Sequence, residues 1–514
     1  MKKTLSAILA VAMTASVLLT GCGNQNKGNG GEKTTLRVEI FERGDVPAGA
    51  GTITDNAMTK WIQENFGEPN NINVEYFSVP RAEEASQLNI LMAANEAPDI
   101  VLTYSYATMY DYAKKGGLTD LSPYMGNASQ LKSFLGEEIL KEGQIDEKQY
   151  LIPANRLVRG RMAQLVRKDW LDAVDMDVPT TTEEFYQVLK AFKEKDPGNL
   201  GDKNIPFGLS MHTPVIEDII QTFVDPNMSM RDKSCIPHPM RPGYKEGVRF
   251  LNKLYNEGLI SADFALDKDR GQLYSDIANG YVGFLNDDLG TIIQKGGVYE
   301  TLKKNNPSAS FAAADTWTDG NGNHPKEIYS PVGIYAAVPQ ASADKAEAAV
   351  KYLDWMAGED VLRTLQYGFE GVTYELDANG IPTVIDSDES KKTHWYTLGF
   401  DLAVIVNGKY NPDNEKIIEM AASNSVENQL YKDCFENSIR DGWAPRMLPP
   451  DEDDFSAQTA LLGEKYSEIL VKGIMAAPDK FDEVFDSLIK EYESIGGNEA
   501  KERNYKLYDQ AYND

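Results

Sequence analysis

Residues 36–41 (LRVEIF), 72–77 (INVEYF) and 97–102 (APDIVL) decide the fold that this sequence predicts. The first two stretches alternate apolar and polar side chains, a period of two that is typical of strands with one buried face. The third is a short apolar run that follows a proline, which is typical of a fully buried strand. The spacing between the three strands leaves room for a helix in each gap.

Two helical segments fill these gaps. Asp55 can cap the first helix. Its apolar stripe consists of Met58, Trp61, Ile62 and Phe66. The second helix spans about residues 82–94 and carries Leu88, Leu91 and Met92 on one face. The order strand, helix, strand, helix, strand predicts a βαβαβ unit, and therefore a parallel sheet with right-handed crossovers.

A second α/β unit begins near Arg161, where residues 162–166 are strand-like. Thr181 and Glu184 fit a capping box at the start of a helix. The apolar stripe of that helix consists of Phe185, Val188, Leu189 and Phe192. Further strands are expected over 281–285 and 331–339, a helix striped by Ala346, Ala349, Val350 and Leu353 after them, and a helix-rich acidic region over about 410–514.

The N-terminus predicts an extracytoplasmic location. Lys2 and Lys3 precede an apolar stretch, residues 5–18, that is short for a membrane span and typical of a signal peptide. It runs into residues 19–22 (LTGC), which resemble a bacterial lipobox, so we expect a signal peptide over 1–21 and lipidation of Cys22. The alternative is a plain secretory signal with a chance cysteine. Residues 22–33 are polar and rich in Gly and Asn, as in a flexible tether.

The composition excludes several classes of function. The chain has 514 residues, 79 acidic against 51 basic, and a formal net charge of −28. This charge disfavours nucleic acid as a partner, and it disfavours a strongly polyanionic ligand unless basic residues converge locally. Cys235 and Cys434 can form a disulfide or remain buried thiols. The sequence contains no sign of a P-loop, a G-x-S-x-G elbow or an H-E-x-x-H motif.

A family resemblance is carried by motifs that lie in order between residues 36 and 376. They are residues 97–100 (APDI), 116–121 (GGLTDL), 150–153 (YLIP), 167–172 (RKDWLD), 179–185 (PTTTEEF), 332–335 (VGIY), 352–355 (YLDW) and 368–371 (GFEG). Together they resemble the family 1 extracellular solute-binding proteins of ABC importers, in particular the large lipoproteins of the family that occur with polysaccharide-use systems.

The resemblance implies an α/β, two-lobed periplasmic-binding-protein fold (type II-like) with a ligand cleft between discontinuous lobes. Mapped onto this chain, one lobe holds residues 34–157 and 332–385, and the other holds 158–331 and 386–514. Ligand binding would close the lobes by bending at the hinge.

The resemblance also implies a function that is not enzymatic. We expect a monomer, lipid-anchored on the extracytoplasmic face of the cell membrane, that captures an oligosaccharide and hands it to the permease subunits of an ABC importer. A sensor lipoprotein that presents its ligand to a signalling receptor remains open as an alternative with the same fold. A secreted glycoside-acting enzyme is the remaining alternative.

Two loops resemble calcium sites only in part. Some family members carry a calcium loop after the helix that follows residue 181, and residues 196–204 (DPGNLGDKN) keep its first aspartate, Asp196, but have lost several oxygen ligands before Asn204. Residues 319–323 (DGNGN) resemble the start of an EF-hand, but His324 stands where a glycine is needed. We expect turns at both places, and no metal or cofactor.

Candidate ligand contacts are the polar and aromatic residues that follow the predicted strands, because ligands of α/β sheets bind beyond the carboxyl ends of strands. Saccharide sites combine aromatic platforms with side chains that bind hydroxyl groups. The candidates are Glu42, Arg43, Tyr104, Tyr106, Asn155, Arg156, Arg159, Asn286, Asp287, Asp288, Trp317, Glu370 and Trp395.

Several of these candidates have a structural alternative. Trp317 and Trp395 can serve packing instead of ligand binding. Tyr104 and Tyr106 alternate, so that only one of them need face the ligand. Asp287 and Asp288 can cap the following helix. Arg156 and Arg159 can form ion pairs at the surface or between the lobes.

Overall fold

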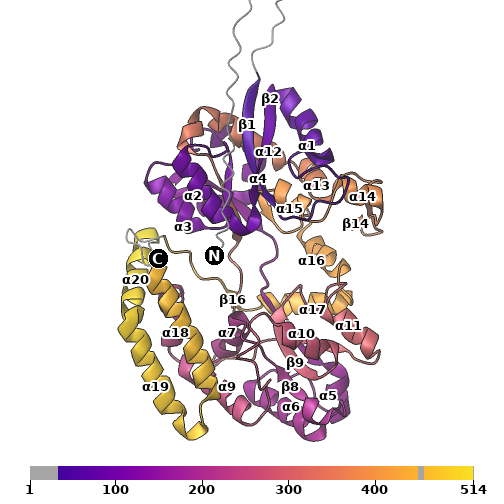
Figure 1. Cartoon of the computed structure of the whole chain (residues 1–514), viewed down its shortest axis with the longest axis vertical. Helices are drawn as coiled ribbons and strands as arrows, with labels where there is room; N and C mark the ends of the chain where they lie inside the picture. The colour runs from indigo at the N-terminus through magenta and orange to yellow at the C-terminus, as the bar shows by residue number, and fades with distance from the viewer. Residues whose placement is uncertain (1–32, 412, 450–455, 513–514) are drawn as a thin grey trace, which may run out of the picture.

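The computed structural model describes residues 33–411, 413–449 and 456–512. The predicted signal peptide, most of the tether and Cys22 lie outside these residues. Figure 1 shows two lobes, one above the other, with the chain passing between them more than once. Within the described residues no helix is both long and apolar enough to cross a membrane.

The first lobe begins with the predicted parallel unit. β1 (Thr34–Glu42) pairs in parallel with β2 (Ile72–Pro80) over its whole length. Val38 makes a further parallel bridge to Ile100, which directly precedes β3 (Val101–Thr103). The helices between these strands are α1 (Ala57–Ile62) and α2 (Glu84–Ala94). The βαβαβ prediction is therefore confirmed.

The cap of α1 differs from the prediction by one residue. Asn56, not Asp55, accepts the N–H bonds of Met58 and Thr59, at 2.9 and 3.1 Å. Thr59 completes a capping box by accepting the Asn56 N–H. Asn56 is buried, so that its side chain is fixed where it can bind the helix terminus.

A second sheet of the first lobe has the strand order β15-β6-β12-β3. β6 (Leu151–Arg156) pairs antiparallel with β12 (Val332–Ala337), which in turn pairs with β3. β15 (Val406–Asn407) pairs with β6 in parallel. Four strands that are separated in the sequence thus build one sheet.

The expected boundary at residue 385 is too early. α14 (Asp388–Thr393) and α15 (Leu398–Leu402) belong to the first lobe, and Trp395 and residues 402–406 pack in its core. The reason is the apolar run LAVIV at 402–406, which is buried throughout and ends in β15. The chain still contacts the first lobe at Tyr410, whose ring packs against that core, and returns to the second lobe beyond it.

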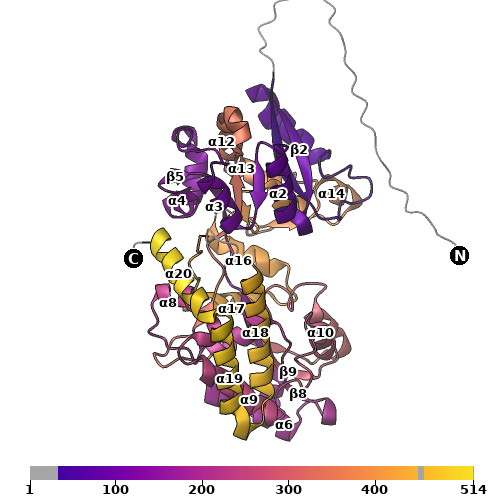
Figure 2. The ribbon, with the colours of Figure 1, turned by 60° about the vertical axis from the view of Figure 1, so that its left-hand side comes forward.

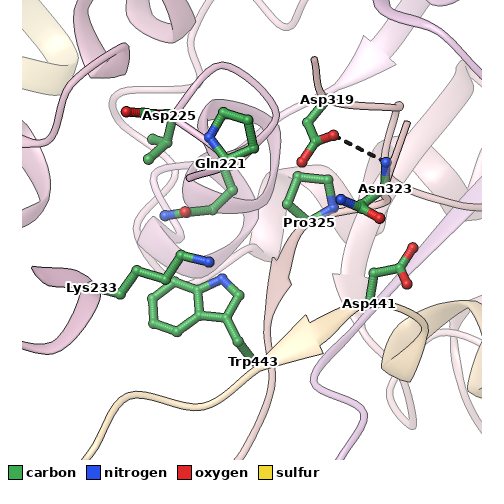
Figure 3. Close-up of a pocket in the computed structure, with 10 residues that line it drawn as sticks. Gln221, Asp225, Lys233, Asp319, Asn323, Pro325, Asp441 and Trp443 are labelled. Atoms are coloured by element: carbon green, nitrogen blue, oxygen red, sulfur yellow. Dashed lines mark hydrogen bonds between the residues drawn. The ribbon is translucent and has the colours of Figure 1, made fainter. Parts of the chain in front are cut away.

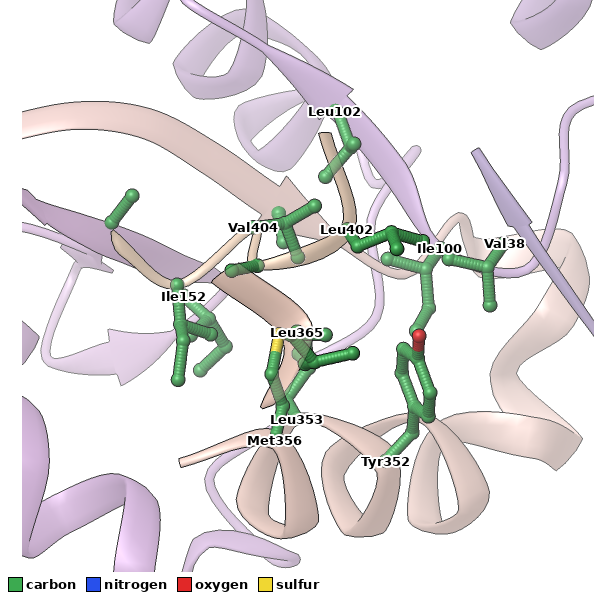
Figure 4. Packing of buried hydrophobic residues seen from close by; sticks show 14 of the residues in the cluster. Val38, Ile100, Leu102, Ile152, Tyr352, Leu353, Met356, Leu365, Leu402 and Val404 are labelled. Atoms are coloured by element: carbon green, nitrogen blue, oxygen red, sulfur yellow. The ribbon is translucent and has the colours of Figure 1, made fainter. Parts of the chain in front are cut away.

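The core of the first lobe lies between this sheet and the helices α12 (Ala346–Met356) and α13 (Glu359–Tyr367) (Figure 4). Leu353 and Met356 of α12 point toward Leu365 and toward Ile152 of β6. Each of these side chains is nearly inaccessible to water. Burial of one such side chain contributes about 1.5–3 kcal/mol. The other described helices of this lobe are α3 (Tyr106–Lys114) and α4 (Ser129–Lys141).

The second lobe is built on a sheet of order β10-β7-β9-β8. Its strands are β7 (Met162–Arg167), β8 (Ile205–Gly208), β9 (Val282–Asp288) and β10 (Phe311–Ala314). β7 runs antiparallel to β9, whereas β8 runs parallel to it. The helices around it are α5 (Lys168–Val174), α6 (Thr182–Lys195), α7 (Thr213–Gln221), α8 (Met230–Cys235), α9 (Tyr244–Asn256), α10 (Gly271–Ala278), α11 (Val298–Asn305), α16 (Asn414–Ser423) and α17 (Asn428–Ile439).

Two details of this lobe bear on the sequence analysis. The capping box of α6 is present, because Thr181 accepts the Glu184 N–H while the Glu184 carboxylate accepts the Thr181 N–H. The four apolar residues of its predicted stripe are all buried. Cys235 and Cys434 are both buried and free, so the two do not form a disulfide.

The C-terminal region is helical, as predicted. α18 (Ser456–Met475) and α19 (Phe481–Tyr492) run along the second lobe, and α20 (Asn498–Ala511) leads back toward the first lobe (Figure 2). Met447 connects this region to the first lobe, because its sulfur accepts a hydrogen bond from Tyr335 Oη at 3.1 Å and its carbonyl accepts one from Tyr512 Oη at 2.8 Å.

The lobes are joined by crossing segments that lie side by side. Arg156 donates its backbone N–H to Pro331 O at 2.8 Å, and Tyr329 donates its own to Arg159 O at 3.0 Å. On the other side, Leu157 donates its backbone N–H to Asn407 O at 3.3 Å. These crossing segments therefore lie together, at residues 156–159, 329–331 and 407. We call this region the waist.

Candidate functional site

The carboxyl ends of strands from both lobes meet at this waist. In the first lobe, β6 ends at Arg156, which pairs with Asn407 at the end of β15. In the second lobe, Met162 is the first residue of β7 after the crossing, and it pairs with Asp288, the last residue of β9. The end of β9 therefore lies beside the crossing and faces the first lobe. Crevices outside the carboxyl ends of strands are the usual ligand sites of α/β sheets.

A pocket of about 260 Å³ opens at the end of the first-lobe strands. We call it the Tyr104 pocket. It is lined by Arg43, Tyr104, Ile334, Tyr396, Thr397, Phe400, Val406 and Asn407. Aromatic rings, one guanidinium, three hydroxyl groups and one amide thus share a small space. This combination suits a ligand that presents both apolar ring faces and hydroxyl groups.

Arg43 is held in place at this pocket by Asp401. The Arg43 Nε lies 2.9 Å from Asp401 Oδ2, and Nη2 lies 2.8 Å from Oδ1, a bidentate pair. The hydrogen bonds that Arg43 donates to the Asp401 carboxylate raise the pKa of Arg43, so the guanidinium stays charged. Burial raises the pKa of Asp401, and Arg43 opposes that effect. The pair fixes the end of β1 against α15.

Tyr104 and Tyr106 take different directions, because Tyr104 follows the end of β3 whereas Tyr106 is the first residue of α3. Tyr104 lines the pocket, stacked on Phe41 with ring centroids 6.1 Å apart and covered by the Arg81 guanidinium at 4.0 Å. Tyr106 instead packs against Tyr335, with centroids 5.6 Å apart. Of the two, the structure brings only Tyr104 to the pocket.

The opposite wall of the pocket comes from residues that sequence reasoning missed. Tyr396 is 64% exposed and meets Phe400 edge to face at 5.1 Å. Lys409 Nζ lies 4.7 Å from the Phe400 ring and 5.1 Å from the Tyr396 ring. Thr397 donates a hydrogen bond to Asp45. The aromatic density of residues 395–400 (WYTLGF) was the available signal, but this segment was expected in the other lobe.

The second lobe presents a row of polar atoms without partners at the facing edge. Buried side-chain atoms that make no hydrogen bond to any described residue occur here in Gln164, Ser210, His212, Asn286 and Asp287. Gln164 and Asn286 are direct cross-strand neighbours on β7 and β9. An unsatisfied buried polar group costs about 1–3 kcal/mol, so bound water or a ligand is expected to complete the hydrogen bonds of this row. We call these five residues the polar edge.

Asp287 and Asp288 do not cap the following helix with their side chains. Instead, Arg270 Nη1 lies 2.6 Å from Asp287 Oδ1 and 2.5 Å from Asp288 Oδ2. Asp287 is fully buried, burial raises its pKa, and its second oxygen belongs to the polar edge. His212 completes this corner, and desolvation lowers its pKa.

A buried carboxyl group supports the polar edge from behind. Asn286 Nδ2 donates to Asp218 Oδ2 of α7 at 3.4 Å, which directs the amide. Burial raises the pKa of Asp218 to about 7, because water no longer stabilises its charge. The neighbouring Glu217 has its pKa raised to about 7 by burial as well, against the hydrogen bond that Tyr244 donates to it.

Four of the predicted contacts lie elsewhere. Trp317 is fully buried in the second core, stacked on Phe185 at 4.1 Å, and Trp395 is 6% exposed in the first core. Both serve packing, so their prediction as ligand platforms is wrong. Glu370 is exposed in a loop away from the Tyr104 pocket. Glu42 accepts the Gly44 N–H at 2.6 Å in the turn after β1.

Arg156 and Arg159 lie at the waist beside Tyr329. The Arg156 guanidinium covers the Tyr329 ring at 4.6 Å, and Arg159 Nε donates to the Tyr329 carbonyl at 3.0 Å. Within the described residues neither arginine forms an ion pair. The predicted alternative of an interlobe ion pair therefore does not hold for them.

A second pocket of about 260 Å³ lies within the second lobe (Figure 3). It is lined by Gln221, Val224, Asp225, Pro226, Lys233, Asp319, Asn323, Pro325, Asp441 and Trp443. Asp319 accepts the N–H groups of Asn321 and Asn323, so the EF-hand-like segment forms the expected turn. Asp441 accepts the His324 N–H at 2.9 Å. Two carboxylates of this second pocket, those of Asp319 and Asp441, thus already accept hydrogen bonds from the protein backbone. The lining of this pocket includes no strand end of either main sheet.

The other calcium-like loop is also a turn. The Asp196 carboxylate accepts the N–H groups of Leu200 and Gly201, at 3.0 and 2.8 Å. Asn204 donates to the Phe192 carbonyl at 2.7 Å. Across the part of the chain that the structure describes, no group of three or more His, Cys, Asp or Glu residues is placed to hold a metal ion.

Comparison with known proteins agrees with this geometry. The family model described as bacterial extracellular solute-binding protein matches residues 48–362. The chain belongs to this family. It is a family of solute-binding proteins, and its members are not enzymes.

Individual relatives match nearly the whole chain. Lipoprotein LipO of Bacillus subtilis is 25% identical over 516 residues, 96% of each chain. The polygalacturonan/rhamnogalacturonan-binding protein YtcQ of Bacillus subtilis is 24% identical and covers 86% of each chain. Among solved structures, an HMO-binding, ABC-transporter-associated solute-binding protein of Bifidobacterium longum infantis covers 93% of this chain and 99% of its own, with a TM-score of 0.62 and 19% identity. That structure confirms the periplasmic-binding-protein fold.

The assignment of Trp317 to packing is testable by Trp317→Phe. The smaller ring leaves a cavity beside Phe185, and we expect a loss of about 1–3 kcal/mol in the free energy of unfolding. Ligand affinity should stay within twofold of the wild type in calorimetric titration. A large loss of affinity at unchanged melting temperature would show that the indole contacts the ligand.

The buried Asp218 predicts a pH dependence of stability. Its folded pKa of about 7 lies above its ordinary value, so its favourable contribution is complete only at pH values below that ordinary value and is lost as pH rises from there to about 7. We expect the melting temperature of Asp218→Asn to rise relative to that of the wild type between pH 5 and pH 8. Asp263→Asn, at an exposed position, is the matched control. If the difference in melting temperature between Asp218→Asn and the wild type is the same at pH 5 and pH 8, the prediction is wrong.

Proposed function

We propose that this protein captures an oligosaccharide between its two lobes and delivers it to an ABC importer. The observation that carries the proposal is the meeting of the aromatic Tyr104 pocket and the polar edge at one waist. The pocket supplies Tyr104, Tyr396 and Phe400 for sugar ring faces. The polar edge supplies unpartnered donors and acceptors for hydroxyl groups.

The location of these groups also explains how binding closes the lobes. The pocket is made by the first lobe and the polar edge by the second, while the crossings between them are only a few residues long. A ligand that contacts both sets stabilises the closed arrangement by its contacts to the second lobe. Closure is then the signal that a membrane partner can recognise.

Names of related proteins support a saccharide as the ligand. YtcQ is named for binding polygalacturonan and rhamnogalacturonan, and the Bifidobacterium protein for binding HMO in association with an ABC transporter. We propose the same class of ligand and partner for this chain. Residues 19–22 and the relative LipO support a lipid anchor at Cys22, which would hold the protein on the extracytoplasmic face of the membrane. Two or more acyl chains give stable anchoring where one does not.

A thermal-shift screen of residues 34–514 against plant, algal and host oligosaccharides tests the ligand class. A ligand at a hundredfold excess over its Kd stabilises the folded protein by about 2.7 kcal/mol and raises its melting temperature. Tyr396→Ala should weaken binding of the responding saccharide at least about tenfold, because it removes an aromatic face of the pocket. Tyr186→Ala, in α6 and outside the lining of the Tyr104 pocket, should not. Shifts with peptides or amino acids alone would overturn the saccharide assignment.

The lipid anchor predicts a simple fractionation result. The wild-type chain expressed in a Gram-positive host should partition with the membrane, and Cys22→Ala should appear in the medium, because no acyl group can then attach. Cys235→Ala is the control, because that thiol is buried in the folded protein. Membrane retention of Cys22→Ala would contradict the proposal.

A further inference from the structure

Arg156 differs from the arginines of this protein that are held by carboxylates. Arg231, Arg249 and Arg270 each lie within 2.7 Å of a carboxylate oxygen. In a chain with 79 acidic residues against 51 basic ones, such pairing is the expected condition. Arg156 has no carboxylate partner among the described residues, and its guanidinium donates no hydrogen bond to any of them.

The surroundings of Arg156 consist of aromatic rings. Its guanidinium lies 4.6 Å from the Tyr329 ring centroid, and Tyr104 and Tyr335 are its other electrostatic neighbours. Its Nε is buried without a partner. Desolvation lowers the pKa of Arg156, since partial burial takes water from the charge and no anion replaces it. An anion bound at this place would remove that cost.

Further cations gather around the same place. Arg161 lies 5.9 Å from the Tyr329 ring, and its nearest carboxylate, Glu327, is 3.6 Å away. Arg159 donates a hydrogen bond from Nε to the Tyr329 carbonyl and forms no ion pair with a described residue. Arg81 covers Tyr104, the ring that lines the pocket. Carboxylates are present too, but Asp401 is held by Arg43 and Asp45 accepts the Thr397 hydroxyl.

We propose that the oligosaccharide is anionic and that the carboxylate of a uronic acid residue binds Arg156. This inference rests on the proposed function and names its substrate class. A carboxylate is the group that matches a planar guanidinium with two parallel hydrogen bonds. The sugar ring that bears it would lie along Tyr329 and Tyr104, so that the charge and the ring face are recognised together. The net charge of −28 does not oppose this, because basic residues converge at this place.

Calorimetric titration of the tether-deleted protein tests the inference. The probes are trimers of galacturonate, of mannuronate and of guluronate, each beside its methyl ester, together with neutral trimers and a sulfated trimer. One uronate should bind, and its methyl ester, which keeps the backbone but not the charge, should bind at least tenfold more weakly. Raising the salt concentration should weaken binding of the acid and leave binding of the ester unchanged.

Arg156→Gln should abolish the preference for acid over ester. Arg231→Gln, which removes an exposed and distant arginine, should keep it. Arg156→Lys retains the charge without the planar fork and should keep part of the preference. Should Arg156→Gln fail to fold, the wild-type comparison of acid with ester and the lysine variant still decide the outcome.

The outcomes separate the two proposals. Binding of neutral trimers without binding of uronates overturns the anionic class and leaves the saccharide function intact. Preference for the sulfated trimer overturns the carboxylate assignment, and an acid preference that survives Arg156→Gln overturns the role of Arg156. Binding of no saccharide at all overturns the proposed function as well.

Discussion

The antiparallel contact of the two crossing segments is the constraint on which the rest of the structure depends. The hydrogen bonds of Arg156 to Pro331 and of Tyr329 to Arg159 fix where each chain segment leaves one lobe and enters the other. The strand ends that bear functional groups are thereby brought to one place. β6 and β15 end there from above, and β9 ends there from below, paired with the first residue of β7. A shift of this register would turn Arg156 and Tyr329 away from each other.

The two halves of the site are built on opposite principles. The Tyr104 pocket is fixed by contacts that the protein makes with itself, such as the bidentate pair of Arg43 with Asp401. The polar edge is left incomplete, with Gln164, Asn286 and Asp287 carrying unpartnered atoms at the end of a well-packed sheet. Groups of this kind destabilise the folded protein unless water or a ligand completes their hydrogen bonds, so a ligand that replaces the water at this edge finds donors and acceptors in place. A preformed Tyr104 pocket and an incomplete polar edge together favour closure of the two lobes only when a ligand is present.

Local sequence patterns predicted the elements well, and they predicted the site only in part. The βαβαβ unit, the capping box of Thr181 and Glu184, and the stripe of α6 follow from short-range periodicity. The position of segment 388–407 in the first lobe does not follow from such periodicity. It depends on the pairing of β15 with β6, which lies some 250 residues earlier in the chain. That one error concealed Tyr396, Thr397 and Phe400. The prediction of Trp317 and Trp395 as ligand contacts was wrong for a related reason. The absence of a periodic apolar pattern around a tryptophan does not show whether the fold buries its side chain.

The acidity of the chain and a basic binding site are compatible because electrostatic interactions are local. At physiological ionic strength the screening length is about 8 Å, so distant surface carboxylates contribute little at the waist. What matters there is the balance within contact range, and Arg156 meets aromatic rings instead of acids. The acidic surface keeps other basic side chains occupied in ion pairs, as at Arg249 and Arg270. An arginine left unpaired in such a chain is therefore more informative than one in a neutral protein, because carboxylates are abundant and the fold has placed none beside it.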